Sequence, residues 1–379
     1  MPLTKQQHLD GAMAPKRILS LDGGGIRGIL TLEYLSAIET ILKQRSGRAD
    51  FRLCDYFDLI GGTSTGSILA AGLACGMSVD QLKALYRNLG TQIFVRERFR
   101  VPYLAPKFPA GPLQEVLDRE LGAETLLRSD KIRTGVMIMT KRMDTGSPWP
   151  LHNHPNAPYY AQDGELRLAQ VVRASTAAPT YFEPEAVEIS SRDGVKTKAT
   201  FVDGGVSPFN DPALQLLMLA VLDGHGFRWR SGKEQLLLIS AGTGTYKKPF
   251  ESAGVAGRVA AVQGIQALAS LMDDCASTNH CMMQWLTNCI TPWKINRAVD
   301  TMELDSKSGP QLATYARYNV LLEPAWMKDA LNLDRSREEL EALADMAEAS
   351  NMEALAEVGA IAAKKQVKEE HFPPAFDLH

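Results

Sequence analysis

The chain lacks the features that mark secreted, membrane-spanning or zinc-binding proteins. It has only 5 cysteines in 379 residues, and no two of them form a Cys-x-x-Cys pair. Scattered cysteines in odd number and apolar surroundings are typical of free thiols in a reducing compartment. The first 16 residues hold no apolar signal-peptide core, and no run of about 18 apolar residues occurs anywhere. We therefore expect a cytoplasmic protein without a metal site.

A strong charge bias is also missing. Lys and Arg total 41 against 44 Asp and Glu, a formal net charge of −3. This balance supplies no overall attraction to nucleic acid polymers or anionic membranes, so any membrane contact must be local and transient. With 45% hydrophobic residues, the chain is long enough to bury a large core.

The most informative stretch is Gly61-Gly62-Thr63-Ser64-Thr65-Gly66. Apolar runs before and after it predict a strand, a sharp turn and a helix. A serine at such a turn exposes its hydroxyl, and the flanking glycines provide room. The N-terminus of the following helix favours an oxyanion beside the serine. We therefore expect Ser64 to attack an acyl carbonyl. The alternatives are a structural turn and a phosphate-binding loop, although Ser67 stands where that loop needs Lys.

A second glycine loop, Asp22-Gly-Gly-Gly-Ile-Arg-Gly28, follows a short predicted strand and opens a helix. Gly23, Gly25 and Gly28 match the dinucleotide fingerprint, but the next strand runs into the serine turn instead of ending in an acidic residue. We expect the N–H groups around Gly24 and Gly25 to form an anion-binding nest facing Ser64. Arg27 would steady this loop or a substrate phosphate; the alternative is an ordinary surface arginine.

Strand and helix patterns alternate along the rest of the chain. Predicted strands cover 134–140, 200–202, 235–240 and 313–322, and predicted helices cover 79–89, 113–121, 166–175, 212–222, 254–290 and two segments within 335–367. This alternation predicts an α/β fold with a largely parallel sheet covered on both faces, with ligands at the carboxyl ends of its strands. Residues 1–15 are predicted to be a flexible N-terminus.

Two other segments invite functional interpretations. His152 and His154 lie in a predicted proline-rich loop, 145–162, but no third ligand has a recognisable spacing, so we expect ordinary loop histidines. Residues 93–108 interleave aromatic side chains with Arg96, Arg98, Arg100 and Lys107. Such a composition suits a bilayer interface, and it equally suits core aromatics with a solvated rim of arginines.

Four motifs in this order resemble those of bacterial patatin-like phospholipases. They are Asp22–Gly28, Gly62–Gly66, the Ala174-Ser-Thr-Ala-Ala-Pro179 block and Asp203-Gly204-Gly205. The resemblance implies a three-layer α/β fold with a Ser–Asp dyad, in which Ser64 is the nucleophile and Asp203 the base. It further implies an oxyanion hole made by Gly23, Gly24 and Gly25, with Gly28, Gly62, Gly66, Gly204 and Gly205 as motif glycines.

The reaction implied by the resemblance is hydrolysis of acyl esters in phospholipids or lysolipids, without metal or cofactor. It also implies a patatin-like domain over residues 16–330, followed by a C-terminal helical extension, 331–379. Two alternatives stay open. One is a phospholipase activated by a cyclic oligonucleotide in antiphage defence, and the other is a non-catalytic lipid-binding or storage protein.

The predicted base is an aspartate, which places a condition on its surroundings. An ordinary aspartate has a pKa near ~3.9 and is a weak base at neutral pH. We therefore expect Asp203 to be desolvated or hydrogen-bonded, so that its pKa lies closer to neutrality. The alternative is an aspartate that only shapes an Asp-Gly turn.

Overall fold

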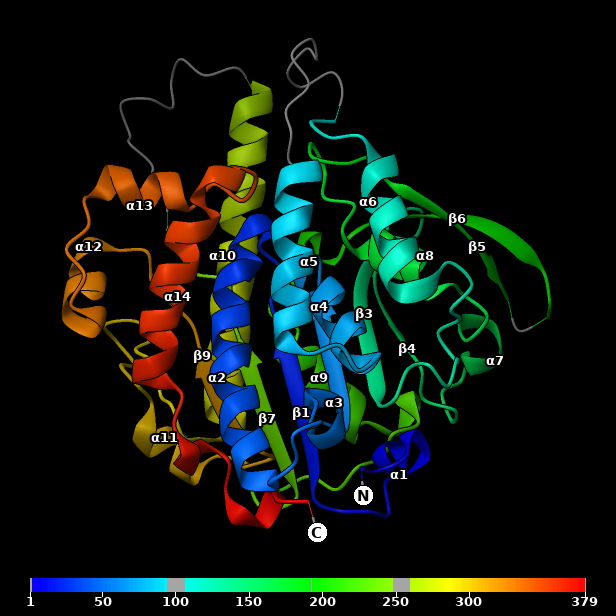
Figure 1. Cartoon of the computed structure of the whole chain (residues 1–379), viewed down its shortest axis with the longest axis horizontal. Helices are drawn as coiled ribbons and strands as arrows, with labels where there is room; N and C mark the ends of the chain where they lie inside the picture. The colour runs from blue at the N-terminus through cyan, green and yellow to red at the C-terminus, as the bar shows by residue number, and fades with distance from the viewer. Residues whose placement is uncertain (1, 94–105, 192, 248–259, 379) are drawn as a thin grey trace.

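The computed structural model describes residues 2–93, 106–191, 193–247 and 260–378 of the chain (Figure 1). Within them lies one nine-stranded sheet in the order β5-β6-β3-β2-β1-β7-β9-β8, with β4 also paired to β3. The strands are β1 Lys16–Leu21, β2 Leu59–Thr63, β3 Gly135–Arg142, β4 Ser147–His152, β5 Glu185–Ser190, β6 Lys196–Asp203, β7 Leu236–Ala241, β8 Asn288–Cys289 and β9 Thr314–Tyr318.

The sheet is parallel from β3 across β2, β1, β7 and β9 to β8, as the sequence predicted. The pairs of β4 and β6 with β3, and of β5 with β6, are antiparallel. Successive residues of the central strands belong to two hydrophobic clusters, as in Ile18 and Leu19 of β1. Because side chains alternate between the two faces of a strand, this shows that both faces are covered and that the fold has three layers.

Helices cover the two faces unequally, and α2 and α5 lie in front of the strands in Figure 1. The larger cluster includes residues of α2, α4, α5, α8 and α14, and the smaller one residues of α9 and α10. The helices are α1 Lys5–Leu9, α2 Gly28–Ser46, α3 Leu53–Tyr56, α4 Thr65–Ala74, α5 Val79–Gln92, α6 Ala110–Leu117, α7 Tyr160–Asp163, α8 Leu168–Ser175, α9 Ala213–Val221, α10 Ala260–Leu286, α11 Glu303–Ser308, α12 Pro324–Trp326, α13 Arg337–Leu343 and α14 Met352–Gln366.

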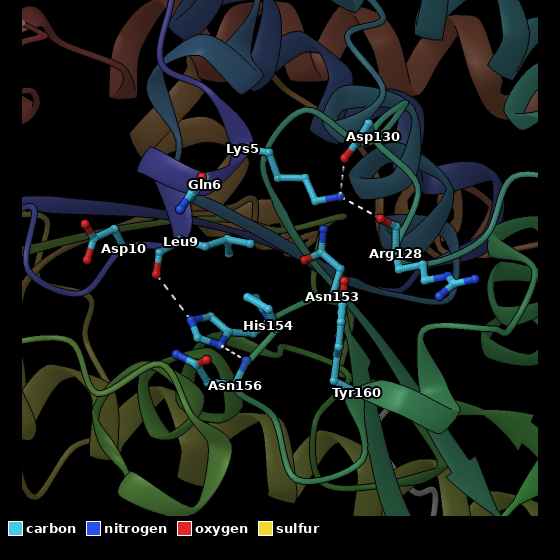
Figure 2. Close-up of a pocket in the computed structure, with 11 residues that line it drawn as sticks. Lys5, Gln6, Leu9, Asp10, Arg128, Asp130, Asn153, His154, Asn156 and Tyr160 are labelled. Atoms are coloured by element: carbon cyan, nitrogen blue, oxygen red, sulfur yellow. Dashed lines mark hydrogen bonds and ion pairs between the residues drawn. The ribbon is translucent and has the colours of Figure 1, made fainter.

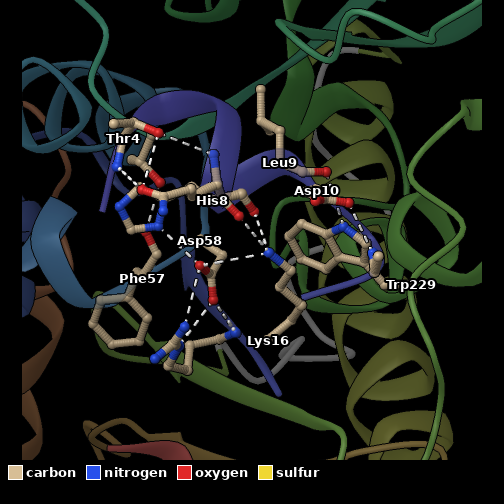
Figure 3. A network of polar contacts seen from close by, with 12 residues as sticks. Thr4, His8, Leu9, Asp10, Lys16, Phe57, Asp58 and Trp229 are labelled. Carbon is tan, nitrogen blue, oxygen red and sulfur yellow. Dashed lines mark hydrogen bonds and ion pairs between the residues drawn. The ribbon is translucent and has the colours of Figure 1, made fainter. Parts of the chain in front are cut away.

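The N-terminus differs from the flexible segment predicted for residues 1–15. Thr4 caps α1, and His8 and Leu9 of this helix are buried. Asp58, at the start of β2, is fully buried and lies 2.8 Å from His8 Nδ1 and 2.8 Å from Arg17 Nε (Figure 3). A buried carboxylate requires such partners, and the short α1 is held in place by supplying one of them.

Part of the predicted proline-rich loop 145–162 is instead the strand β4, which pairs antiparallel with β3. Pro148 and Pro150 stand at alternate positions of β4, so their missing N–H groups fall on one side of the strand. Because β4 pairs only with β3 among the described strands, both prolines fit on its open edge.

The predicted C-terminal helices are confirmed as α13 and α14, and Ser336 and Glu339 form the predicted capping box. Leu340 and Leu355 belong to the same hydrophobic cluster as the central strands. The helices beyond residue 330 thus share the main core. The division of the chain at residue 330 stays a prediction.

Candidate active site

Ser64 lies at a strained turn between β2 and α4. Its backbone has φ 54° and ψ −124°, a left-handed conformation that non-glycine residues rarely adopt. A Cβ on Gly62 would collide with the backbone of Gly66, and a Cβ on Gly66 with the backbone of Leu21. The turn thus requires both glycines, and it leaves Ser64 partly exposed between the buried residues Thr63 and Thr65.

Ser175, at the end of α8, supports this turn. The Ser64 N–H donates to Ser175 Oγ at 2.9 Å, and the Ser175 hydroxyl donates to the Met139 carbonyl at 2.6 Å. The fully buried Ser175 hydroxyl therefore connects the serine turn to β3. Sequence reasoning included Ser175 in a motif block but assigned it no role.

Asp203 ends β6 and faces Ser64. Its carboxylate accepts the Gly205 N–H at 2.7 Å. Only 4% of Asp203 is exposed, and burial raises its pKa to about 6, although the nearby Ser64 side chain, the Gly205 N–H and the charge of Arg173 lower it. The predicted desolvation is thus present, and it makes the carboxylate a better base near neutral pH.

The register of the sheet brings Asp203 level with Ser64. Thr63 of β2 pairs with Met139, and the next residue of β3, Thr140, pairs with Asp203. β6 runs antiparallel to β3, and only its last residues pair with the carboxyl end of β3. The carboxyl end of β6 therefore lies at the same edge of the sheet as the carboxyl ends of the parallel strands. Gly204 follows at once, and a Cβ there would meet the backbone of Met139, so the chain must turn away on a glycine.

The glycine loop offers fewer free donors than the sequence predicted. The Gly23 N–H already donates to the Asn210 carbonyl at 3.1 Å. Among the described residues, the Gly24 and Gly25 N–H groups donate no hydrogen bond. A Cβ on Gly23 would lie 3.1 Å from Ser64 Cβ, so the loop borders the serine. In this loop the Gly24 and Gly25 N–H groups are therefore available to an oxyanion, whereas the Gly23 N–H is already occupied.

Arg27 contacts the glycine loop from its C-terminal side. Its N–H donates to the Gly24 carbonyl at 3.2 Å, and its Nε lies 3.5 Å from the same oxygen. Burial lowers the pKa of the Arg27 guanidinium, while Asp273 is the largest influence in the opposite direction. Arg27 is thus in contact with the loop, and its role toward a substrate phosphate stays a prediction. Gly28 packs beneath Tyr86, whose hydroxyl would lie 2.6 Å from a Cβ at that position.

A buried ion cluster beneath the glycine loop was missed by sequence reasoning. Arg317 of β9 lies 2.7 Å from Asp22 Oδ1, 3.2 Å from Asp211 Oδ2 and 2.6 Å from Ser240 Oγ. The pKa of Asp22 is raised to about 7, chiefly by burial; Arg317 opposes this rise and Asp211 contributes to it. Since Asp22 immediately precedes Gly23, the cluster anchors the start of the loop. In the sequence, Arg317 was marked only by its place in the predicted strand 313–322.

The histidines and a nearby cavity lie away from Ser64. His152 and His154 are buried, and burial, followed by the charges of His154 and His225, lowers the pKa of His152 to about 3. A cavity of about 480 Å³ lies between α1 and the segment that contains His154 (Figure 2). It adjoins the amino ends of the strands, and none of the predicted site residues lines it.

Most of the predicted membrane segment, 93–108, lies outside the described residues, including Arg96, Arg98 and Arg100. Within its described part, Ile93 and Phe108 are buried, and Lys107 Nζ lies 4.5 Å from the centre of the Tyr181 ring. In the described parts of the chain, no helix combines the length and apolarity that a bilayer span requires.

Comparison with known proteins finds similarity to phospholipases and patatins. The sequence profile described as Patatin-like phospholipase matches residues 19–217, just over half of the chain. The chain is 36% identical over 205 residues to a cGAMP-activated phospholipase of Escherichia coli (strain TW11681), covering 53% of this chain and 55% of the relative. It is 34% identical over 242 residues to Patatin-17 of Solanum cardiophyllum, covering 60% of each.

The chain thus spans little more than half the length of these relatives. Human GIVD cytosolic phospholipase A2 has a similar solved structure, with 13% identity, a TM-score of 0.45, and coverage of 98% of this chain and 62% of that one. The matched region contains the serine turn, the glycine loop and Asp203, and the chain belongs to the patatin-like phospholipase family.

Proposed function

We propose that this protein hydrolyses acyl esters of phospholipids or lysophospholipids through a Ser64–Asp203 dyad. The observation that carries the proposal is the place of Ser64, on its strained turn, near a buried carboxylate whose pKa is raised to about 6. An aspartate that only shapes a turn has no need of such burial beside a serine. Family membership and the phospholipase names of the relatives support the same chemistry.

The proposed reaction has two stages. In the first, Asp203 accepts the hydroxyl proton of Ser64 while Oγ bonds to the ester carbonyl carbon, and the Gly24 and Gly25 N–H groups bind the oxyanion. Collapse breaks the bond to the lysolipid or glycerol oxygen, which takes the proton from Asp203. In the second stage, Asp203 removes a proton from water, the resulting hydroxide attacks the acyl-Ser64 ester, and the fatty acid leaves as Ser64 regains its proton.

A fluorophosphonate probe and a phospholipid substrate test the proposal together. We expect the probe to label wild type on Ser64, and we expect Ser64→Ala to abolish both labelling and hydrolysis. Ser46→Ala is the matched control, because Ser46 ends α2, about 27 Å along this helix from the glycine loop at 1.5 Å per residue. Labelling or undiminished hydrolysis in the Ser64→Ala protein would contradict the nucleophile assignment.

We propose as a second point that a cyclic dinucleotide activates this hydrolysis. The support is the 36% identity over 205 residues to a bacterial phospholipase described as cGAMP-activated. Hydrolysis of mixed liposomes should then rise on addition of cGAMP and should not rise with equal amounts of AMP and GMP. Equal rates in all three conditions would contradict the activation and leave the hydrolase proposal untouched.

We also propose that the protein reaches its substrate as a peripheral membrane protein. The support is the interleaving of aromatic and arginine side chains in residues 93–108 of an otherwise slightly acidic chain. Rings of this kind can enter an interface while cations meet lipid phosphates.

A further inference from the structure

The three carbonyls of the glycine loop are each held by a different part of the fold. The Gly23 carbonyl accepts from Thr243 Oγ1 at 2.8 Å and from Asn210 Nδ2 at 3.3 Å. The Gly24 carbonyl accepts from the N–H of Arg27 at 3.2 Å. The Gly25 carbonyl accepts from the hydroxyls of Thr65 and Tyr86.

These contacts control where the free N–H groups point. In a trans peptide the C=O and the N–H lie in one plane and point in opposite directions. The partner of the Gly23 carbonyl therefore sets the direction of the Gly24 N–H. Glycine has no side chain to restrict its backbone, so this direction depends on outside contacts more than it would at another residue.

Thr243 is well placed to supply this control. It follows β7, which pairs with β1 up to Leu21 and Ala241, so the turn after β7 lies beside the loop after β1. Thr243 is 3% exposed, and its Cβ would lie 2.6 Å from a Cβ on Gly24. The hydroxyl thus meets the Gly23 carbonyl from a fixed, buried position.

The Thr243 turn is itself fixed by neighbouring elements. Thr31 of α2 donates its hydroxyl to the Gly242 carbonyl at 2.8 Å, and the Gly244 N–H donates to Asn319 Oδ1 at 2.9 Å. The contact with Asn210 is longer, and Asn210 also lies in an irregular segment between β6 and α9. Of the two donors to the Gly23 carbonyl, Thr243 consequently makes the shorter hydrogen bond and lies in the more firmly supported segment.

We propose that Thr243 is a positioning residue that aims the Gly24 N–H at the oxyanion by holding the Gly23 carbonyl. This proposal rests on the proposed acyl hydrolase function and gives a positioning role to the Gly242-Thr243-Gly244 turn. A donor aimed at developing charge acts mainly in the transition state, so loss of its aim lowers kcat and leaves KM nearly unchanged.

The test is Thr243→Val, which removes the hydroxyl and keeps the shape of the side chain. We expect kcat on a soluble short-chain ester to fall by about 10- to 100-fold, below the loss on the order of 10²–10³ typical when a donor is removed outright. We expect KM to stay within about twofold, since substrate binding precedes oxyanion formation. Thr243→Ser should restore kcat, and Thr243→Ala replaces the valine variant if the latter does not fold.

Thr134→Val is the matched control. It removes a buried hydroxyl, just before β3, that donates to the Phe57 carbonyl at 2.6 Å, and it touches none of the contacts of the glycine loop. We expect a similar decrease in melting temperature for both variants and a loss of kcat only for Thr243→Val. Equal losses of kcat, or a loss expressed in KM, would overturn the positioning role.

The outcomes also separate this proposal from the function on which it rests. Normal kcat in Thr243→Val, together with no activity in Ser64→Ala, would refute the role of Thr243 and leave the hydrolase intact. Absence of ester hydrolysis by the wild type would refute both.

Discussion

Replacement of Asp203 by Asn should remove activity and, at neutral pH, make the protein more stable. The ionised carboxylate is buried, and burial raises its pKa from 3.8 to about 6. At 1.36 kcal/mol per pKa unit, this costs the folded state about 3 kcal/mol once the group is ionised. Asparagine is neutral at every pH and can still accept the Gly205 N–H.

The pH dependence follows from the direction of the shift. The folded protein binds the Asp203 proton more tightly than the unfolded chain does, so wild type loses stability as pH rises from about 4 to about 6. The amide that replaces the carboxyl group in the variant does not titrate. We therefore expect the two proteins to differ by up to about 3 kcal/mol at pH 8 and to converge below about pH 3, where both side chains are neutral in both states.

Urea unfolding of both proteins at several pH values measures this difference, because all other groups titrate alike. In parallel, wild-type kcat should fall as pH decreases through about 6, where the base becomes protonated. Asp163→Asn is the matched control, because burial also raises the pKa of Asp163, in α7, to about 6. It should retain the activity and the acid limb of the profile.

Two results would refute this reasoning. A stability difference between wild type and Asp203→Asn that does not change with pH would mean that ionised Asp203 carries no such cost. The second is an Asp203→Asn protein that stays active and still loses kcat as pH decreases through about 6, together with an Asp163→Asn protein that no longer does so. That result would show that Asp203 is not the base.

Three further changes test other parts of the site. Arg317→Met leaves Asp22 and Asp211 as uncompensated buried charges and should lower the free energy of unfolding by about 3–5 kcal/mol; a loss below about 1 kcal/mol in urea unfolding would contradict the ion cluster. Ser175→Ala leaves the Ser64 N–H without its acceptor, so it should cost about 1–3 kcal/mol of stability and lower kcat; an unchanged kcat would show that the turn holds without it. Combined replacement by Gln of Arg96, Arg98 and Arg100 should weaken sedimentation with anionic liposomes and leave short-chain ester hydrolysis unchanged. Equal losses in both assays would mean that residues 93–108 support the fold and do not contact the membrane.

The sequence by itself determined the local units of the site. The Gly-x-Ser-x-Gly turn, the strand before it and the helix after it were predictable, because each depends on residues within a few positions along the chain. Gly62 and Gly66 are required by a turn in which a Cβ would strike the backbone, and Ser336 and Glu339 cap a helix by contacts three residues apart. Family motifs added the pairing of Ser64 with Asp203.

Only the tertiary structure decided which partners these units meet. The Gly23 N–H donates to the carbonyl of Asn210, and the buried carboxylate of Asp22 pairs with Arg317. Both partners lie far along the chain from the glycine loop. The antiparallel direction of β6 and the docking of α1 on Asp58 were likewise invisible in local patterns. The physical reason is that hydrophobic periodicity reports which face of an element is buried, whereas the partner of a buried polar group depends on which distant segments the fold places beside it.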